Sequence, residues 1–358
     1  MAKPKQKLVN LALQGGGAHG AFAWGVLDRL LEDGRLDIEG VCACSAGTMN
    51  ALALAQGLEV GGNDAARESL ENLWRQVSIA GAKYSPMAQS GVANLFPTEW
   101  SNALSFFLFD STSRLLSPYQ FNPLDINPLR DLLAELIDFE RVRHCSAVKL
   151  FISATHVKSG KVRVFDSNEL SLDVALASAC LPYLFKAVEI DGEHYWDGGY
   201  MGNPSLYPLF YKTDSRDIII VHINPLVRDE IPKTAPDIFN RINEISFNSS
   251  LIDDMRAIAF VKKLINQDIL KEESRSQFKD ILLHSVRSDA AMCDLDVSSK
   301  FKTDWKFLTD LRDRGRQVMD AWLSKHFKDV GIRDSVDLHT EFLSSVTELF
   351  KQQDGGAA

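Results

Sequence analysis

The chain is poor in cysteine, and the few cysteines it has do not form a metal site. Five occur among 358 residues, mostly in apolar segments and without the paired spacing of a zinc site. Their positions are 42, 44, 145, 180 and 293. Cys42 and Cys44 lie two residues apart on one apparent strand, so alternation directs both side chains to the same face. We expect reduced, buried thiols, and we expect no metal ion or other cofactor.

Long apolar runs and an excess of positive charge are also missing. The run Leu8–Leu13 follows a basic N-terminus but ends after six residues at Gln14, which is too short for a signal-peptide core or a membrane span. Lys and Arg number 39 against 48 Asp and Glu, a net charge of −9, which argues against nucleic acid as a partner. We expect a cytoplasmic protein whose first strand begins near Leu8.

What remains is the composition of an ordinary globular protein, 45% hydrophobic and 24% charged. The first fifty residues show the order strand, loop, helix, strand, turn, helix, and Gly34 supplies the stop of the first helix. That order predicts an α/β fold with a mostly parallel central sheet and helices on both faces. The pattern predicts further strands at 148–155, 161–165, 187–190, 193–196, 217–225 and 280–285, and further helices at 64–77, 127–140, 171–179, 251–265 and 308–322.

The pattern of the chain changes near residue 230. We expect an α/β domain over residues 1–230 and a mainly helical C-terminal extension over 231–358 that packs on the same domain. Residues 81–125 are irregular and contain an apolar patch at 104–109, which is typical of a lid or binding loop, with buried loop packing as the alternative. The last residues, 352–358, have the composition of a frayed tail.

The second predicted strand ends at Ser45, directly before a helix. The sequence Ala43-Cys44-Ser45-Ala46-Gly47 approaches the pattern G-x-S-x-G, with Ala43 in the place of the first glycine and Gly47 in the second. A serine between small residues at such a junction lies on a sharp turn, with its hydroxyl exposed above the positive end of the helix. Ser45 is therefore a candidate nucleophile, and a helix cap is the alternative.

The glycine-rich loop after the first strand has two interpretations. Gly15, Gly17 and Gly20 satisfy the dinucleotide-binding pattern G-x-G-x-x-G, but that pattern wants an acidic residue at the end of the second strand. Asp37 and Glu39 precede the strand that we predict. Consecutive glycines also let backbone N–H groups converge on one point, as in an oxyanion hole. Because both loops follow adjacent parallel strands, they would face one crevice with Ser45, and we favour the oxyanion hole.

A third signal is Asp197-Gly198-Gly199, which follows the predicted strand 193–196. An aspartate at a strand end, followed by two glycines, has its carboxylate on a loop whose backbone can come close to another segment. Asp-Gly is also a common turn dipeptide. Together with an exposed serine and a glycine loop, Asp197 is a candidate general base.

With these three motifs the chain resembles the patatin-like phospholipase family of acyl hydrolases, over roughly residues 8–225. The resemblance implies a patatin-like fold with additional C-terminal helices. It implies Ser45 as the nucleophile and Asp197 as its base, in a dyad without histidine. The implied oxyanion hole consists of Gly15, Gly16 and Gly17, and the implied supporting residues are His19, Gly47 and Gly198. His19 occupies a place that is often basic in the family, and Ala43 departs from the family pattern.

The resemblance also implies a function and a partner. It implies a lipid acyl hydrolase of the phospholipase A, lysophospholipase or esterase type, acting on a lipid or other hydrophobic ester, with peripheral contact to a lipid surface. Three alternatives remain open. They are a Ser-His-Asp triad using His222, within the predicted strand 217–225, or His19; a nucleotide-binding module using the loop Gly15–Gly20; and a lipid-binding scaffold without activity, for which Ala43 is the hint.

Overall fold

The computed structural model describes residues 6–84, 116–228, 230–267, 269–270, 277–293, 295 and 298–344. The apolar patch expected at 104–109, most of the irregular stretch 81–125 and the tail from residue 352 lie outside these residues.

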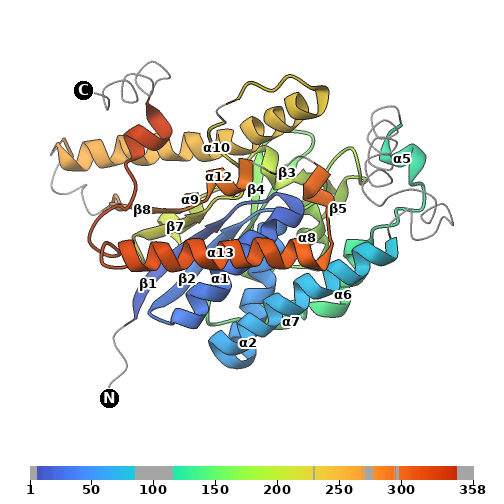
Figure 1. Ribbon diagram of the computed structural model, residues 1–358, viewed down its shortest axis with the longest axis horizontal. Coiled ribbons are helices and arrows are strands. Elements are labelled where there is room, and N and C mark those ends of the chain that lie inside the picture. Colours follow the sequence, from blue (N-terminus) through green and yellow to red (C-terminus); the bar gives the residue numbers. More distant parts are fainter. Residues whose placement is uncertain are drawn as a thin grey trace.

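The described chain is built around a mixed, mostly parallel sheet of eight strands (Figure 1). The strand order is β5-β6-β3-β2-β1-β7-β8, and β4 pairs with β3 beside this path. Strands β3, β2, β1, β7 and β8 run parallel, whereas β4, β5 and β6 join by antiparallel pairing. The strands are β1 (Lys7–Leu13), β2 (Leu36–Ala43), β3 (Lys149–His156), β4 (Val162–Asp166), β5 (Val188–Ile190), β6 (Glu193–Asp197), β7 (Asp217–Val221) and β8 (Leu282–Val286).

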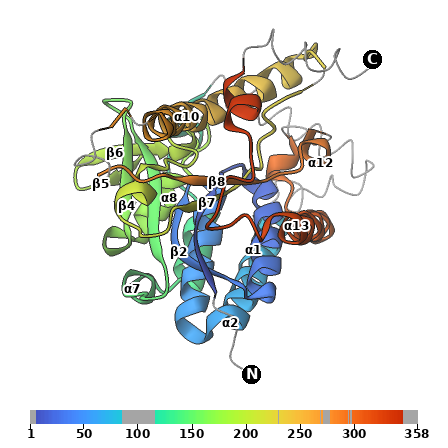
Figure 2. The same cartoon turned by 90° about the vertical axis from the view of Figure 1, so that its left-hand side faces the viewer.

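Helices cover both faces of the sheet (Figures 1 and 2). The α-helices are α1 (Gly20–Asp33), α2 (Ala46–Tyr84), α5 (Pro118–Phe121), α6 (Pro128–Leu136), α7 (Phe139–Arg143), α8 (Leu172–Ser178), α9 (Tyr207–Tyr211), α10 (Ala235–Asn266), α12 (Asp289–Cys293) and α13 (Trp305–His326). Shorter helical turns are η1 (Gly17–His19), η2 (Ser167–Glu169), η3 (Gly198–Tyr200), η4 (Ser298–Phe301) and η5 (His339–Leu343). Helix α2 is two helices joined at a kink, where Gly61 and Gly62 leave helical geometry.

The alternation of side chains along the strands explains the two covered faces. In β1, Leu11 and Leu13 belong to the core that contains α1, α2 and α13, whereas Ala12 belongs to the core that contains α9 and α10. The same alternation occurs in β7, where Ile219 and Ile218 face the two opposite cores. A parallel sheet buried on both faces reads as a continuous apolar run, as these strands do. The predicted α/β fold is confirmed.

Residues after 231 add to the same sheet. Strand β8 pairs with β7 in parallel, and α13 packs across α1, where the rings of Trp24 and Trp305 lie 5.9 Å apart. Figure 2 shows α13 beside α1 on one side of the sheet and α10 on the other. In the described residues we find no helix that combines the length and apolarity needed to cross a membrane.

Three predicted boundaries were wrong. Strand β2 begins at Leu36, so Asp37 and Glu39 lie within it. Its first residues alternate between buried and exposed positions, and Asp37 and Glu39 occupy the more exposed ones. Strand β7 ends at Val221, so His222 follows the strand. The helix expected over 127–140 is two helices, because Asp138 starts α7 by accepting a hydrogen bond from the Arg141 N–H.

Candidate active site

Ser45 lies between β2 and α2 in a conformation that few residues adopt. Its φ angle is +51°, in the left-handed region, and 9% of its surface is exposed. The backbone N–H of Ser45 is within hydrogen-bond distance of the carbonyl (3.1 Å) and the hydroxyl (3.0 Å) of Ser178, at the end of α8. A non-glycine residue held at positive φ is often part of a functional site. The local geometry is that of a sharp turn leading into a helix N-terminus.

Ser45 does not cap α2. The backbone N–H groups of Gly47 and Thr48 donate to the backbone carbonyls of Cys44 and Ser45, at 2.8 and 2.9 Å. Among the described residues, no hydrogen bond joins the Ser45 hydroxyl to the first turn of α2. The hydroxyl is therefore not occupied in the helix-cap role that we considered from the sequence.

The register of the sheet brings Asp197 level with Ser45. Strand β3 lies between β2 and β6. Ala43, the last residue of β2, pairs with Ile152, and two residues further along β3 Ala154 pairs with Asp197. Ser45 follows Ala43 by the same two residues. The two side chains, 152 residues apart in sequence, therefore lie at the same edge of the sheet.

The Asp197 carboxylate is completely buried, and one of its oxygens has room for a partner. Oδ1 accepts hydrogen bonds from the Gly199 N–H (2.7 Å) and the Cys44 thiol (3.4 Å). Oδ2 has no hydrogen-bond partner among the described residues. Burial raises the pKa of Asp197 to about 6, while the nearby Gly199 N–H, Ser45 hydroxyl and Cys44 thiol and the charge of Lys300 oppose the rise. Asp197 is therefore a carboxylate that titrates near neutrality beside Ser45.

The glycine loop lies against the serine turn, as adjacent parallel strands predict. A Cβ added to Gly15 would lie 2.6 Å from Ser45 Cβ, so only glycine fits there. The Gly15 N–H donates to Asn203 Oδ1 at 2.6 Å and is already used. Hydrogen bonds from the N–H groups of Gly16 and Gly17 do not occur among the described residues. Within the described chain, two of the three expected donors therefore have no acceptor.

His19 is buried beside the glycine loop. It is 4% exposed, and its Nε2 lies 2.7 Å from the hydroxyl of Ser299. Burial, followed by the charges of Lys300 and Arg228, lowers the pKa of His19 to about 3. The imidazole therefore supplies no positive charge near pH 7. Lys300 lies next to this loop, because a Cβ added to Gly17 would collide with the Lys300 backbone carbonyl.

Gly47 and Gly198 lie where a side chain would meet backbone. A Cβ on Gly47 would collide with the carbonyl of Leu13, and a Cβ on Gly198 would collide with the carbonyl of Ser153. These contacts join the serine turn to β1 and the aspartate turn to β3. Both glycines therefore hold the two turns close to the sheet.

His222 forms no hydrogen bond with this cluster among the described residues. It is 2% exposed, stacks on Phe342 at 6.0 Å between ring centroids, and both ring nitrogens lack partners among the described residues. Burial, followed by the charge of Arg287, lowers its pKa to about 3. Among the described residues, no hydrogen bond joins Ser45 to a histidine.

Several residues of the cluster were missed from the sequence. They are Cys44, Ser178, Asn203, Asn224 and Lys300. The C-x-C pattern predicts two buried core thiols, and Cys42 is one of them. Strand β2 ends at Ala43, however, so Cys44 turns toward Asp197. The positions of the other four residues carried no local signal.

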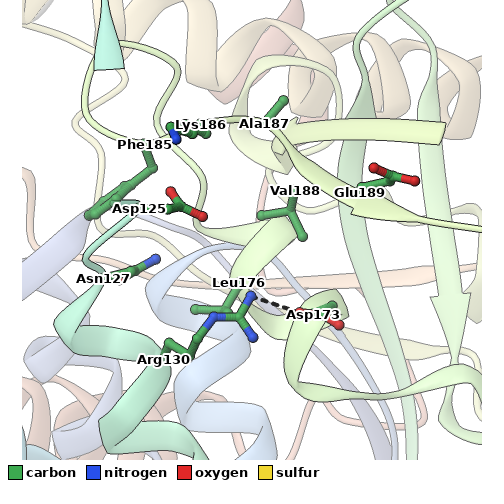
Figure 3. A pocket seen from close by; sticks show the side chains of 10 residues that line it. All are labelled: Asp125, Asn127, Arg130, Asp173, Leu176, Phe185, Lys186, Ala187, Val188 and Glu189. Carbon is green, nitrogen blue, oxygen red and sulfur yellow. Dashed lines mark hydrogen bonds and ion pairs between the residues drawn. The ribbon is translucent and has the colours of Figure 1, made fainter. Parts of the chain in front are cut away.

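A separate cavity of about 260 Å³ lies between α6, α8 and β5 (Figure 3). It is lined by charged groups, including an ion pair in which Arg130 Nη2 lies 2.8 Å from Asp173 Oδ1. None of the predicted site residues lines it. This cavity is therefore distinct from the cluster around Ser45.

The comparison of the sequence with protein families gives one match that spans the cluster. The family model of the patatin-like phospholipases matches residues 11–210, more than half of the chain. The chain belongs to the patatin-like phospholipase family. The matched range contains the glycine loop, Ser45 and Asp197 and ends before β7. Membership places the chain among lipid hydrolases at the level of the family. No curated protein matches the sequence significantly.

Solved structures give matches at low identity. VipD from Legionella pneumophila is 16% identical with a TM-score of 0.37, and the match covers 89% of this chain and 67% of VipD. The type III effector ExoU, from Pseudomonas aeruginosa, is 17% identical with a TM-score of 0.34, and the match covers 90% of this chain and 54% of ExoU. The chain thus spans about half the length of ExoU.

Proposed function

We propose that this member of the patatin-like family is a serine acyl hydrolase that cleaves carboxylic esters of lipids, with Ser45 as nucleophile and Asp197 as general base. The observation that carries the proposal is the pairing of a serine at positive φ on a helix N-terminus with a buried carboxylate whose Oδ2 is unpartnered among the described residues. Catalytic hydrogen bonds are often long before substrate binds.

In the proposed mechanism, ionised Asp197 takes the Ser45 proton as the hydroxyl attacks the ester carbonyl. The N–H groups of Gly16 and Gly17 bind the oxyanion that develops, and the N-terminus of α2 adds favourable potential. Protonated Asp197 then gives its proton to the leaving alcohol. Water, activated by Asp197, frees the acyl group in the second step. A carboxylate is a weak base for a hydroxyl, so most of the rate has to come from the donors of the oxyanion hole.

A nucleotide-binding module is the less favoured alternative. Its acidic residue would be Glu39, the candidate within β2 that lies nearest to the end of that strand. The Glu39 carboxylate accepts hydrogen bonds from the N–H groups of Asp214 (2.8 Å) and Ser215 (2.8 Å), and it pairs with Lys149 at 3.1 Å. The Glu39 carboxylate is thus engaged in contacts within the protein and is not available to bind the hydroxyls of a ribose.

We further propose a lipid surface as the partner of this site. On α10, Ile238, Ile242 and Ile245 form an apolar stripe with 43%, 57% and 55% exposure. Phe247, on the face of α10 opposite the stripe, packs edge-on against the Tyr200 ring just after the Asp197 turn, at 5.4 Å between centroids. The stripe and the site therefore share one helix, and a lipid surface that covers the stripe would lie on the outer side of that helix. A lipid-binding scaffold without activity would make the same contact with a lipid surface but would not cleave the ester.

The test is the intact mass of the protein after treatment with a fluorophosphonate, for wild type, Ser45→Ala and Asp197→Asn. We expect one adduct on wild type, none on Ser45→Ala and strongly slowed labelling of Asp197→Asn, with parallel losses of p-nitrophenyl ester hydrolysis. Ser205→Ala is the control, since Ser205 is also buried but lies outside the dyad. Hydrolysis by Ser45→Ala at the wild-type rate would refute the mechanism. Vesicle binding by a wild type that takes no label would favour the scaffold.

A further inference from the structure

The peptide between Gly15 and Gly16 is held by a side chain from the far side of β1. Asn224, which follows β7, is 1% exposed, and its Nδ2 donates to the Gly15 carbonyl at 2.8 Å. The Gly15–Gly16 peptide is trans. In a trans peptide the carbonyl of one residue and the N–H of the next point in opposite directions. Asn224 therefore decides where the Gly16 N–H points.

The order of the strands gives that direction. Strand β1 lies between β2 and β7. Asn224 extends from the end of β7, and Ser45 extends from the end of β2. The Gly15 carbonyl turns toward Asn224, on the β7 side. The Gly16 N–H consequently turns toward the β2 side, where Ser45 lies.

Lys300 contributes to the orientation of the Asn224 amide. Its Nζ lies 3.3 Å from Asn224 Oδ1, and Asn224 Nδ2 also lies 3.5 Å from Gln14 Oε1, so the amide presents its NH₂ group to Gly15. Lys300 is half-buried, and its ammonium also lies over the Phe247 ring, at 5.9 Å from the centroid. Within the part of the chain that the structure describes, no carboxylate forms an ion pair with Lys300. Glu244, whose charge acts on Lys300, is held by Arg228 at 2.6 Å and Arg241 at 3.2 Å.

We propose that Asn224 and Lys300 are positioning residues of the active site, which act in series to aim the Gly16 N–H at the oxyanion. Both lie outside the range that the family model matches, residues 11–210. The C-terminal part of the chain, through η4, thereby completes the oxyanion hole. This inference rests on the proposed acyl hydrolase function, and it adds two residues to it.

The test compares Asn224→Leu and Lys300→Met with wild type in p-nitrophenyl butyrate hydrolysis near pH 8.5, where Asp197 is ionised and its titration no longer affects the rate. Loss of one oxyanion donor lowers kcat by roughly 100-fold or more. We expect Asn224→Leu to lower kcat by about 10–100-fold, because the donor is misdirected rather than removed. For Lys300→Met, which acts through Asn224, we expect a loss of about 5-fold. KM should change little in either variant.

A double-mutant cycle separates positioning from general damage. Because Lys300 acts through Asn224, the double variant should lose no more than Asn224→Leu alone, and Lys300→Arg should recover most of the rate. A trifluoromethyl ketone binds as a tetrahedral oxyanion, so its affinity should fall in proportion to kcat/KM across the variants. Lys302→Met is the matched control, since Lys302 lies two residues away over the Phe307 ring. Thermal unfolding identifies any variant that fails to fold, and Lys300→Met decides the question if Asn224→Leu does not fold.

Three results would overturn the inference. They are folded variants with wild-type kcat, losses confined to KM, and losses that add fully in the double variant. An inactive wild type that also takes no fluorophosphonate label would instead refute the hydrolase function, and this inference with it. An active wild type with unaffected variants refutes only the positioning role.

Discussion

The thiol of Cys44 donates a hydrogen bond to the carboxylate of Asp197, with Sγ 3.4 Å from Oδ1. Both side chains are completely buried. Burial, followed by the nearby charge of Asp197, raises the pKa of Cys44 well above its usual value, so the thiol stays protonated and remains a donor. The residue directly before the proposed nucleophile thus lowers the pKa of the proposed base.

This contact predicts the pH dependence of activity. Burial raises the pKa of Asp197 to about 6, and a protonated carboxyl cannot accept the Ser45 proton, so kcat/KM should fall on the acid side with a midpoint near pH 6. Cys44→Ala removes a donor to the ionised form and should move that midpoint to higher pH. Cys42→Ala, which changes a thiol in the core, is the control. An identical acid limb in Cys44→Ala and wild type would show that the thiol does not tune Asp197.

Asp197→Asn should be more stable than wild type at pH 8. The folded pKa of about 6 lies above the unfolded value near 3.8, so the native state binds more protons and wild type loses stability as pH rises between these values. Asparagine has no such titration, yet its oxygen can still accept from the Gly199 N–H. We expect a gain on the order of 3 kcal/mol at pH 8, most of which is absent near pH 4. Urea unfolding at both pH values measures it, and an equal effect at the two would contradict the assignment.

Ser45→Gly should gain stability while it loses the nucleophile. Ser45 is held at φ +51°, where a residue with a side chain is strained and glycine is not. The expected rise in the free energy of unfolding is about 1 kcal/mol, because glycine relieves the strain but adds entropy to the unfolded chain. Ser45→Ala keeps the Cβ and serves as the control, with no comparable gain. A Ser45→Gly protein less stable than Ser45→Ala would mean that the turn is not strained.

Ile242→Glu should weaken binding to phospholipid vesicles and leave the active site intact. A charge placed in the exposed stripe of Ile238, Ile242 and Ile245 opposes its burial in a lipid surface. We expect about a tenfold loss in vesicle binding by sedimentation, with unchanged hydrolysis of a soluble ester. Ile332→Glu is the matched control, because Ile332 is 73% exposed and lies outside α10. Equal losses in both variants would remove the stripe from the lipid-binding surface.

The sequence by itself determined the order of the helices and strands and the strand ends at which the candidate site residues lie. Apolar runs, Gly34 and the alternating patterns are local signals, and they predicted the parallel sheet with helices on both faces. Because parallel neighbours end at one edge, the loop at Gly15 and the turn at Ser45 could be expected to meet, and they do. The start of β2 and the end of β7 were wrong. Glu39 lies within β2, whose first residues alternate between buried and exposed, and His222 lies in a buried segment that continues beyond the last hydrogen-bonded residue of β7.

Only the tertiary structure decided how the site is held together. The pairing registers of β2 and β6 with β3 place Asp197 at the same height in the sheet as Ser45. The low pKa of His19 depends on its burial and on the charge of Lys300. The direction of the Gly16 N–H depends on Asn224. Each of these contacts joins residues far apart in the chain. Local propensity carries no information about such pairs, so hydrogen bonds between distant side chains are fixed only when the packed sheet brings them together.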